Sequence, residues 1–544
     1  MKRLAIIGGV VALLAISGFL LYQRYWYYAP GIIGNISHPI SDNRDVTWSP
    51  GPADAPSSER PPNIIVIVAD DLGYNDISAF GGGVVQTPSI DAIGRDGVIV
   101  DQGYASNATC SPSRAAIMTG RYPTRFGFEF TSAPQAFARY ISHSSPDALR
   151  PAIFHEERVR DVPPLATLGL PPSEVTIAEM LQQQGYHTML IGKWHLGEVA
   201  SMRPDAQGFN EALGVMQGAA MFLPPNDPDV VNARVDFDPI DRFLWANLPY
   251  AVDWHGADGD ARFRPRGYVT DYFADEAVSA IEANRNRPFF LYLSFTAPHT
   301  PLQATREDYD ALSAIPDHTQ RVYGAMIRSL DRGVGRVMQA LRDNGIDDNT
   351  LVIFVSDNGG AWYTGLADIN APYRGWKSTF FEGGIRTPYF VRWPNGLPRG
   401  AHVTGPASHM DIFTTAAAAA GAPEQPQVDG INLLPYLRGE AQPSRAIFWR
   451  SGPYRVVRDG DWKLQVSETP NRVWLFNLAS DPTEQHDLSA QQPERVAAMR
   501  AMIEAQNANA PPPLWPALIE GAVRIDVPLN APWSEDQEYI YWSN

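Results

Sequence analysis

The segment 63–69 has the sequence NIIVIVA and limits the folds open to this chain more than any other stretch. A continuous β-branched run without polar alternation is typical of a strand buried on both faces of a parallel sheet. Similar runs occupy 289–295 and 350–356, and a shorter one lies at 186–191. Helical patterns separate them, so we expect an α/β fold with a large, mostly parallel sheet sandwiched by helices.

Each of these predicted strands is followed by a polar cluster. The clusters are Asp70–Asp71, the sequence GKWHLG at 192–197, the sequence APHTPL at 297–302, and Asp357–Asn358. Ligands of open α/β sheets bind beyond the carboxyl ends of the strands, so side chains from these clusters are expected to meet at one edge. Lys193 and His195 lie two residues apart and, in extended geometry, would face the same side.

Four of these residues offer oxygen ligands alone: Asp70, Asp71, Asp357 and Asn358. Hard oxygen donors suit Ca²⁺ or Mg²⁺ and are poor ligands for Zn²⁺, which usually takes His or Cys. Taken alone, either pair could equally be ordinary loop residues that cap helices. The sequence therefore offers a metal site as one of two interpretations at this point.

Cys110 is the single cysteine of the 544 residues, so it forms no internal disulfide. It lies among small polar residues in CSPSRAAIMTG, where Ser111 and Pro112 suggest an N-cap and first helical position, and Gly120 an end. Cys110 would then lie at a helix N-terminus with Arg114 one turn on, which suits a nucleophile or an anion site. A lone cysteine near an arginine is, by itself, more often incidental.

The pattern C-x-P-x-R, followed by AAIMTGRYP, resembles the signature of the formylglycine-dependent sulfatases of the alkaline-phosphatase superfamily. The blocks at 192–197, at 297–302 and at 374–388 (RGWKSTFFEGGIRTP) are also similar to sulfatase blocks, except that Trp376 stands where a glycine is more usual. The resemblance covers roughly residues 62–489. It implies an alkaline-phosphatase-like fold and a sulfatase that hydrolyses aryl or carbohydrate sulfate monoesters and releases inorganic sulfate.

The resemblance also implies roles for individual residues. Cys110 would be oxidised to formylglycine by a formylglycine-generating enzyme, and the hydrated aldehyde would attack sulfur. Arg114 would position residue 110, Lys193 and Lys377 would hold sulfate oxygens, His299 or Lys377 would protonate the leaving oxygen, and His195 would act as a base. The metal, calcium by family custom with Mg²⁺ possible, would be held by Asp70, Asp71, Cys110, Asp357 and Asn358.

The formal charge of the chain is −17, yet the expected site is cationic. Three carboxylates and a divalent ion leave about one negative charge, and Arg114, Lys193 and Lys377 add three positive ones. Salt screens charges beyond about 8–10 Å, so the acidic total does not oppose binding of a sulfate ester. The same total makes nucleic acid an unexpected partner.

Residues 4–22 form an apolar run of 19 without a charge, preceded by Lys2 and Arg3. A helix of that length spans roughly 28 Å, which is close to the hydrocarbon thickness of a bilayer. The aromatic cluster that follows suits a membrane interface, so we expect an uncleaved transmembrane anchor with the catalytic domain exported to the periplasmic or extracellular side. A cleaved secretion signal is the competing interpretation.

Four parts are expected along the chain: an anchor at 1–28, a tether at 29–62, a catalytic domain at 63–440, and a C-terminal part at 441–544. Short strands between 446 and 476 and a helix at about 493–508 predict a small antiparallel sheet with one helix, and 511–544 suggests a meandering tail.

Two rival functions and the leaving group stay open. Phosphate or phosphonate monoester hydrolysis is one rival, and a non-catalytic, membrane-tethered protein that binds sulfated glycans is the other. The long segments 133–172 and 216–266 are expected at the pocket rim. Phe222, Trp245, Tyr250 and Trp254 could stack on a substrate ring or could be local packing.

Overall fold

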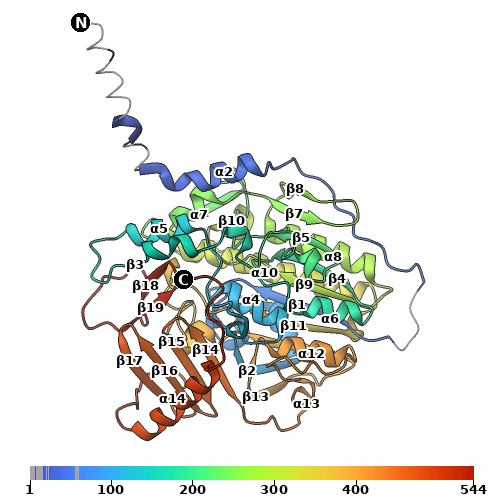
Figure 1. The fold of residues 1–544 in the computed structure, drawn as a ribbon. Helices are drawn as coiled ribbons and strands as arrows, with labels where there is room; N and C mark the ends of the chain where they lie inside the picture. Colours follow the sequence, from blue (N-terminus) through green and yellow to red (C-terminus); the bar gives the residue numbers. More distant parts are fainter. Residues whose placement is uncertain (1–6, 8–15, 20, 22–23, 55–59) are drawn as a thin grey trace.

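The structure is a computed structural model that describes residues 7, 16–19, 21, 24–54 and 60–544 (Figure 1). Most of the predicted anchor at 1–28 lies outside the described residues. Within the described part of the chain, no helix has both the length and the apolar character needed to cross a bilayer.

A ten-stranded mixed sheet forms the centre of the molecule, in the order β13-β2-β12-β11-β1-β9-β4-β5-β7-β8. The strands β11, β1, β9, β4 and β5 run parallel to one another, and β2 and β13 form a second parallel pair. β12, β7 and β8 join the sheet by antiparallel pairing. The bounds are β1 (Asn63–Ala69), β2 (Val98–Tyr104), β4 (His187–Lys193), β5 (Glu211–Val215), β7 (Val252–His255), β8 (Ala261–Phe263), β9 (Phe289–Ser294), β11 (Thr350–Ser356), β12 (Tyr389–Arg392) and β13 (Ala401–Ser408). The predicted large, mostly parallel sheet is confirmed.

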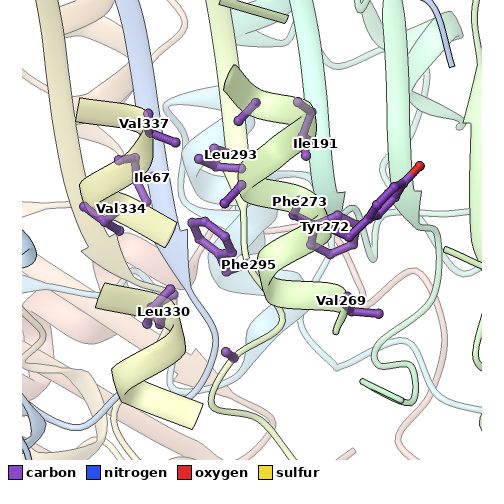
Figure 2. Close-up of a cluster of buried hydrophobic side chains, with 14 of the residues drawn as sticks. Ile67, Ile191, Val269, Tyr272, Phe273, Leu293, Phe295, Leu330, Val334 and Val337 are labelled. Atoms are coloured by element: carbon purple, nitrogen blue, oxygen red, sulfur yellow. The ribbon is translucent and has the colours of Figure 1, made fainter. Parts of the chain in front are cut away.

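Helices cover both faces of this sheet, because its parallel strands are apolar on both sides. One face carries α3 (Pro88–Arg95), α8 (Val269–Asn284) and α10 (His318–Asp343), and the other carries α4 (Cys110–Thr119), α6 (Ile177–Gln183) and α12 (Asp411–Ala419). Figure 2 shows Ile67, Ile191 and Leu293 of the strands facing the side chains of α8 and α10. These residues belong to the first hydrophobic core, between the sheet and α3, α8 and α10. Alternate strand residues, such as Ile64 and Val66, belong to the second core, between the sheet and α4, α6 and α12.

The C-terminal part folds as predicted between 446 and 507, into an antiparallel sheet of four strands with one helix. Its elements are β14 (Ala446–Ser451), β15 (Tyr454–Asp459), β16 (Trp462–Glu468), β17 (Asn471–Asn477) and α14 (Pro493–Asn507). The prediction of a meandering tail after 511 was wrong. β18 (Ile519–Arg524) and β19 (Tyr539–Ser543) pair with each other and, through β18, with β3 (Ile153–Phe154), a long-range contact that the local sequence does not encode.

Shorter elements fill the connections between these layers. β6 (Val230–Ala233) pairs with β10 (Leu302–Thr305) as a two-stranded sheet. The remaining helices are α5 (Gln135–His143), α7 (Pro239–Asn247), α9 (Arg306–Ala311), α11 (Glu382–Ile385) and α13 (Leu434–Leu437).

The segment predicted as a tether carries more structure than its composition suggested. Helix α2 (Ala29–Ser37) lies on the surface beside α7 (Figure 1). Further along, Trp48 is buried in the first core and its indole packs edge-on against Trp254 at 5.0 Å between ring centroids. Residues 29–54 therefore lie close to the large sheet-and-helix body.

Candidate active site

The register of the central strands sets the position of the acidic residues. β1 pairs with β11 so that Ala69 lies opposite Ser356, and both chains leave the sheet at the same level. Asp70 and Asp71 therefore meet Asp357: the amide of Asp71 donates to Asp357 Oδ1 at 3.2 Å. The side-chain amide of Asn358 donates to Asp71 Oδ1 at 2.8 Å, which brings all four predicted oxygen donors together.

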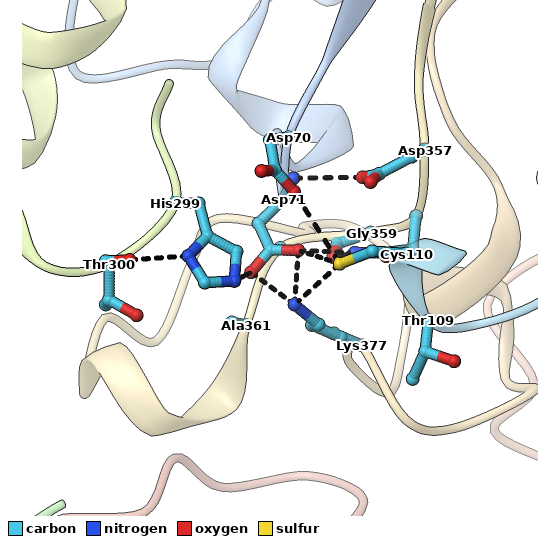
Figure 3. Close-up of polar contacts among 12 residues, drawn as sticks. Asp70, Asp71, Thr109, Cys110, His299, Thr300, Asp357, Gly359, Ala361 and Lys377 are labelled. Carbon is cyan, nitrogen blue, oxygen red and sulfur yellow. Dashed lines mark hydrogen bonds and ion pairs between the residues drawn. The ribbon is translucent and has the colours of Figure 1, made fainter. Parts of the chain in front are cut away.

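Cys110 lies against this group (Figure 3). Its Sγ is 3.6 Å from Asp70 Oδ1, 3.9 Å from Asp71 Oδ1 and 3.2 Å from Lys377 Nζ. Helix α4 begins at Cys110 itself with Thr109 as N-cap, so the prediction that Ser111 caps the helix was wrong. Asn107 accepts from both the amide and the hydroxyl of Thr109, and the helix begins two residues earlier than Pro112 suggested.

Three buried cations neutralise the carboxylates. Lys193 Nζ, at the end of β4, donates to both oxygens of Asp70 at 2.8 and 3.0 Å. Lys377 Nζ does the same for Asp71 at 2.7 and 2.8 Å. Arg114, one turn along α4, donates to Asp357 Oδ2 from Nε at 2.9 Å. Each carboxylate thus has its own cationic partner.

His299 contributes a titratable group on the open side of the site. Its Nδ1 lies 2.5 Å from the carbonyl oxygen of Thr300, so Nδ1 carries a hydrogen, and Nε2 lies 3.7 Å from Asp71 Oδ2. Burial alone would lower the pKa of His299, but the carboxylates of Asp71 and Asp70 and the contact with Cys110 together outweigh burial and raise the pKa.

His195 does not follow the extended geometry expected of it. Its φ is 59°, in the left-handed region, so the backbone is not extended here and the expected common side for Lys193 and His195 no longer follows. Its Nε2 lies 2.9 Å from the carbonyl oxygen of Ser132, and burial lowers its pKa. The ring is therefore neutral with the hydrogen on Nε2, and no hydrogen-bond donor in the described part of the chain reaches Nδ1.

The pKa values of the central groups reflect the competition between burial and ion pairing. Burial raises the pKa of Asp70 to about 7, although Lys193 opposes this. For Asp357, burial is outweighed by Arg114, Lys193 and Lys377 together, and its pKa falls well below the usual range. For Cys110, burial is outweighed by Lys193 and Lys377, and the pKa of the thiol is lowered.

An oxygen atom beside the carboxylates also lacks a protein partner, and it bears on the predicted metal. Asn358 Oδ1 is buried, and among the described residues no donor lies within hydrogen-bonding distance of it. A buried acceptor without a donor is costly unless a cation or water satisfies it. Asp70, Asp71, Cys110 and His299 also place one potential ligand atom each within 4.8 Å of one another. The cluster is consistent with a metal site, and its oxygen atoms, those of Asp70, Asp71 and Asn358, are the ligands that a hard divalent cation would take.

Sequence reasoning missed two polar groups that touch this centre. Tyr363 donates its hydroxyl to Asp71 Oδ2 at 3.0 Å and accepts from Lys377 Nζ at 3.2 Å. Ser294, the last residue of β9, hydrogen-bonds Arg114 through its hydroxyl. Ser294 could have been found from its position at a strand end, whereas Tyr363 follows Asp357 in a loop whose path the sequence does not reveal.

The four aromatic residues singled out for the rim pack locally. Phe222 stacks on Tyr268 at 5.5 Å, and Trp254 is buried in the core against Trp48. Trp245 donates to Asp241, and Tyr250 donates to the carbonyl of Pro265. The unusual Trp376 is buried within the first core as well.

Comparison with known proteins gives one consistent result. The family model described as Sulfatase matches residues 62–422. The chain is 34% identical over 466 residues to the steryl-sulfatase of Mus musculus, covering 74% of this chain and 69% of that protein. It is 32% identical over 446 residues to the N-acetylgalactosamine-6-sulfatase of Canis lupus familiaris, covering 79% and 76%.

Solved structures agree with these relatives. The crystal structure of Ps i-CgsB in complex with k-i-k-neocarrahexaose has a TM-score of 0.69 at 30% identity, covering 84% of this chain and 95% of that chain. The phosphonate monoester hydrolase of Agrobacterium radiobacter shares the fold, with a TM-score of 0.56 at 21% identity over 82% of this chain and 96% of that chain.

Proposed function

This chain belongs to the sulfatase family and is a sulfuric ester hydrolase, and we propose that residue 110 acts in it as a formylglycine nucleophile beside a calcium ion. The observation that carries the proposal is the position of Cys110, whose Sγ lies within 4 Å of Asp70, Asp71 and Lys377 at once. A thiol surrounded by two carboxylates and an ammonium group contributes little to hydrophobic packing. It is consistent with a side chain whose converted form reacts.

The proposed metal ligands are Asp70, Asp71, Asp357, Asn358 and the oxygen of residue 110 after conversion. Bound there, calcium, or magnesium in its place, would supply positive charge that favours the deprotonated form of the nucleophilic oxygen. The unpartnered Oδ1 of Asn358 supports this assignment, because a cation would satisfy it. Conversion of Cys110 would require a formylglycine-generating enzyme as a transient partner.

The cations of the site would bind the sulfate group. Lys377 Nζ lies next to residue 110. Its pKa is well above the ordinary value, because Asp71 and the other acidic groups around it together outweigh burial, so it stays charged. Lys193 is fully buried beside Asp70, and Arg114 is held by Asp357 at the base of α4. Together Lys193 and Lys377 would stabilise charge on the equatorial oxygens, while Arg114 would orient residue 110.

The two histidines suit opposite proton-transfer roles. His299 uses Nδ1 for Thr300, so its Nε2 faces the centre, and the raised pKa favours a protonated ring that can donate to the leaving oxygen. His195 is neutral and has Nδ1 free of donors among the described residues, as a proton acceptor requires. We assign His299 as the acid and His195 as the base.

We propose aryl or carbohydrate sulfate monoesters as substrates. The relatives are named for steryl and N-acetylgalactosamine 6-sulfate esters, and Ps i-CgsB was crystallised with a neocarrahexaose. The names of the two relatives share a sulfate ester of a sterol or sugar alcohol, which is the substrate feature we carry over. We further propose that residues 4–22 anchor an exported catalytic domain on the periplasmic or extracellular side of a membrane.

Turnover of paired substrates tests the reaction. Wild-type protein should hydrolyse an aryl sulfate faster than the matching aryl phosphate, and Cys110→Ala should lower sulfate hydrolysis by about 10⁴-fold or more. The melting temperature of the variant serves as a control for folding. Wild-type activity in Cys110→Ala would refute the role of residue 110, and faster phosphate turnover would favour the rival phosphatase function.

A further inference from the structure

Helix α2 exposes its apolar side chains to solvent, unlike an ordinary surface helix. A surface helix of a globular protein turns its apolar residues toward the core. In α2 the isoleucines Ile32, Ile33 and Ile36 are 58%, 62% and 77% exposed. At 3.6 residues per turn they share one face within about 100° of each other. The helix has no charged residue.

The opposite face of α2 is fixed to the catalytic body. Gly31 donates its amide to Asn247 Oδ1 at 2.7 Å, and Asn247 Nδ2 donates back to the carbonyl of Tyr27 at 2.9 Å. A Cβ added at Gly31 would lie 2.8 Å from Asn247 Cα, so glycine is needed for this close contact with α7. Just before α2, the ring of Tyr27 packs on that of Tyr140 in α5 at 4.3 Å.

The isoleucine face is therefore presented outward by a docked helix, and the identity of what covers it follows from the chain that precedes it. The apolar run at 4–22 ends only a few residues before α2. Exposed aromatic residues, Tyr25 and Tyr28, lie between the two, as is typical of the interface between lipid and water. A contiguous exposed apolar face next to such a run fits a lipid surface.

We infer that the face formed by Ile32, Ile33 and Ile36 lies in the interfacial region of the bilayer and holds the catalytic body against the membrane. The inference rests on the proposed anchor but goes beyond it, because an anchor followed by a free tether would leave the body at a variable distance. Docking through Asn247 and Tyr140 instead gives the body one orientation. Both residues belong to the segments expected at the pocket rim, 216–266 and 133–172.

Depth-dependent fluorescence quenching tests this on the full chain in phosphatidylcholine vesicles, a suitable probe because α2 is uncharged. In a Cys110→Ala background, Ile33→Cys carries an environment-sensitive fluorophore. Bromine atoms on lipid acyl chains should quench it, more strongly near the headgroup than near the chain ends, since such faces lie about 5–10 Å deep. Val175→Cys is the matched control, as Val175 is 51% exposed and precedes α6, away from α2 in Figure 1.

The possible results distinguish contact of the α2 face with the bilayer from anchoring by residues 4–22. Quenching at 33 but not at 175 supports it. Vesicle-bound protein without quenching at 33 overturns the inference and leaves the anchor standing, and an apolar signal at 33 that bromine does not quench would indicate a protein partner and overturn it too. Protein that fails to float with vesicles contradicts both proposals.

A second variant excludes quenching that arises from the anchor alone. With a fluorophore on Ser37→Cys, the combined change of Ile32, Ile33 and Ile36 to serine should abolish quenching while the protein still floats. These side chains are exposed, so folding should be unaffected. Unchanged quenching in this variant would overturn the inference.

Discussion

Two of the buried groups of charged side chains differ in an instructive way: one lies around Cys110 at the strand ends, and one lies around Lys463 at the junction of the large sheet with the C-terminal sheet. In the junction cluster, Lys463 Nζ donates to Glu382 Oε1 at 2.8 Å and contacts Glu484 Oε1 at 3.0 Å. Tyr104 donates to the second oxygen of Glu382, and Gln465 donates to Glu484. All three charged residues are fully buried.

The difference between the clusters lies in their unsatisfied atoms and in their access to solvent. The carboxylates and the ammonium group of the junction cluster all have partners within the protein, and these residues are 0% exposed. Around Cys110, Asn358 Oδ1 lacks a donor among the described residues, and His299 and Lys377 are 9% and 7% exposed. Both clusters contain buried charge, whereas only the cluster that we propose as reactive combines, among the residues compared, an unsatisfied acceptor with partly accessible titratable groups.

The largest expected effect compares matched removals of one buried charge. Asp71→Asn should lower sulfate ester turnover by about 10³-fold, or about 4 kcal/mol, because it removes a proposed metal ligand and the partner of Lys377. Glu484→Gln removes a junction carboxylate and should leave turnover per folded molecule unchanged. Steady-state kinetics on both variants measure this, and an equal loss in the two would erase the distinction.

Lys463→Met tests the structural role of the junction. It leaves Glu382 and Glu484 buried without their shared cation, which should lower the free energy of unfolding by about 3 kcal/mol. Arg386 and Arg458 remain near Glu382 and limit the loss. Chemical denaturation monitored by circular dichroism gives the value. Stability equal to that of wild type would show that the junction cluster does not stabilise the fold.

Calcium should stabilise the protein through the site around Cys110 and not through the junction cluster. At a concentration about 100 times its dissociation constant, a bound ion adds about 2.7 kcal/mol to the free energy of unfolding. A chelator should remove that stabilisation from the wild type, and Asn358→Ala should abolish the response. Glu382→Gln, at the junction, should keep it. Thermal melts with and without calcium decide, and a calcium response that survives in Asn358→Ala would contradict the ligand assignment.

The smallest expected effect concerns Tyr363, which contacts Asp71 without any predicted role of its own. Tyr363→Phe removes one hydrogen bond to Asp71, a loss of about 1 kcal/mol. Turnover should therefore fall roughly five-fold, with a matching decrease in calcium affinity measured by titration calorimetry. Tyr454→Phe, which removes a buried hydroxyl of the C-terminal sheet, is the control and should change neither quantity. A turnover loss as large as that of Asp71→Asn would assign Tyr363 a direct role.

The sequence predicted the parts of the fold that depend on local pattern. The run at 63–69 became β1 with the expected bounds, and the polar residues at its end met those of β11 because parallel strands in register end at one edge. Membership of the sulfatase family followed from the motif at Cys110 and is confirmed.

The rest depended on contacts between distant residues or on backbone conformations that residue type does not determine. The left-handed φ of His195 redirected its ring, and the pairing of β18 with β3 joined segments more than 350 positions apart. The docking of α2 on Asn247 likewise has no local signature, because Gly31 is read from sequence as a loop residue. Positive φ values at Asp71, His195 and Ser378 fall at or beside the site, as is common where function fixes geometry, and a fourth, at Glu484, falls in the junction cluster.

Mass spectrometry of the peptide that contains residue 110, taken from natively matured and enzymatically active protein, tests the central claim most directly. The account predicts formylglycine or its hydrate at that position, next to Asp70, Asp71 and Lys377. An unmodified cysteine thiol in protein that hydrolyses sulfate esters at its full rate would contradict it.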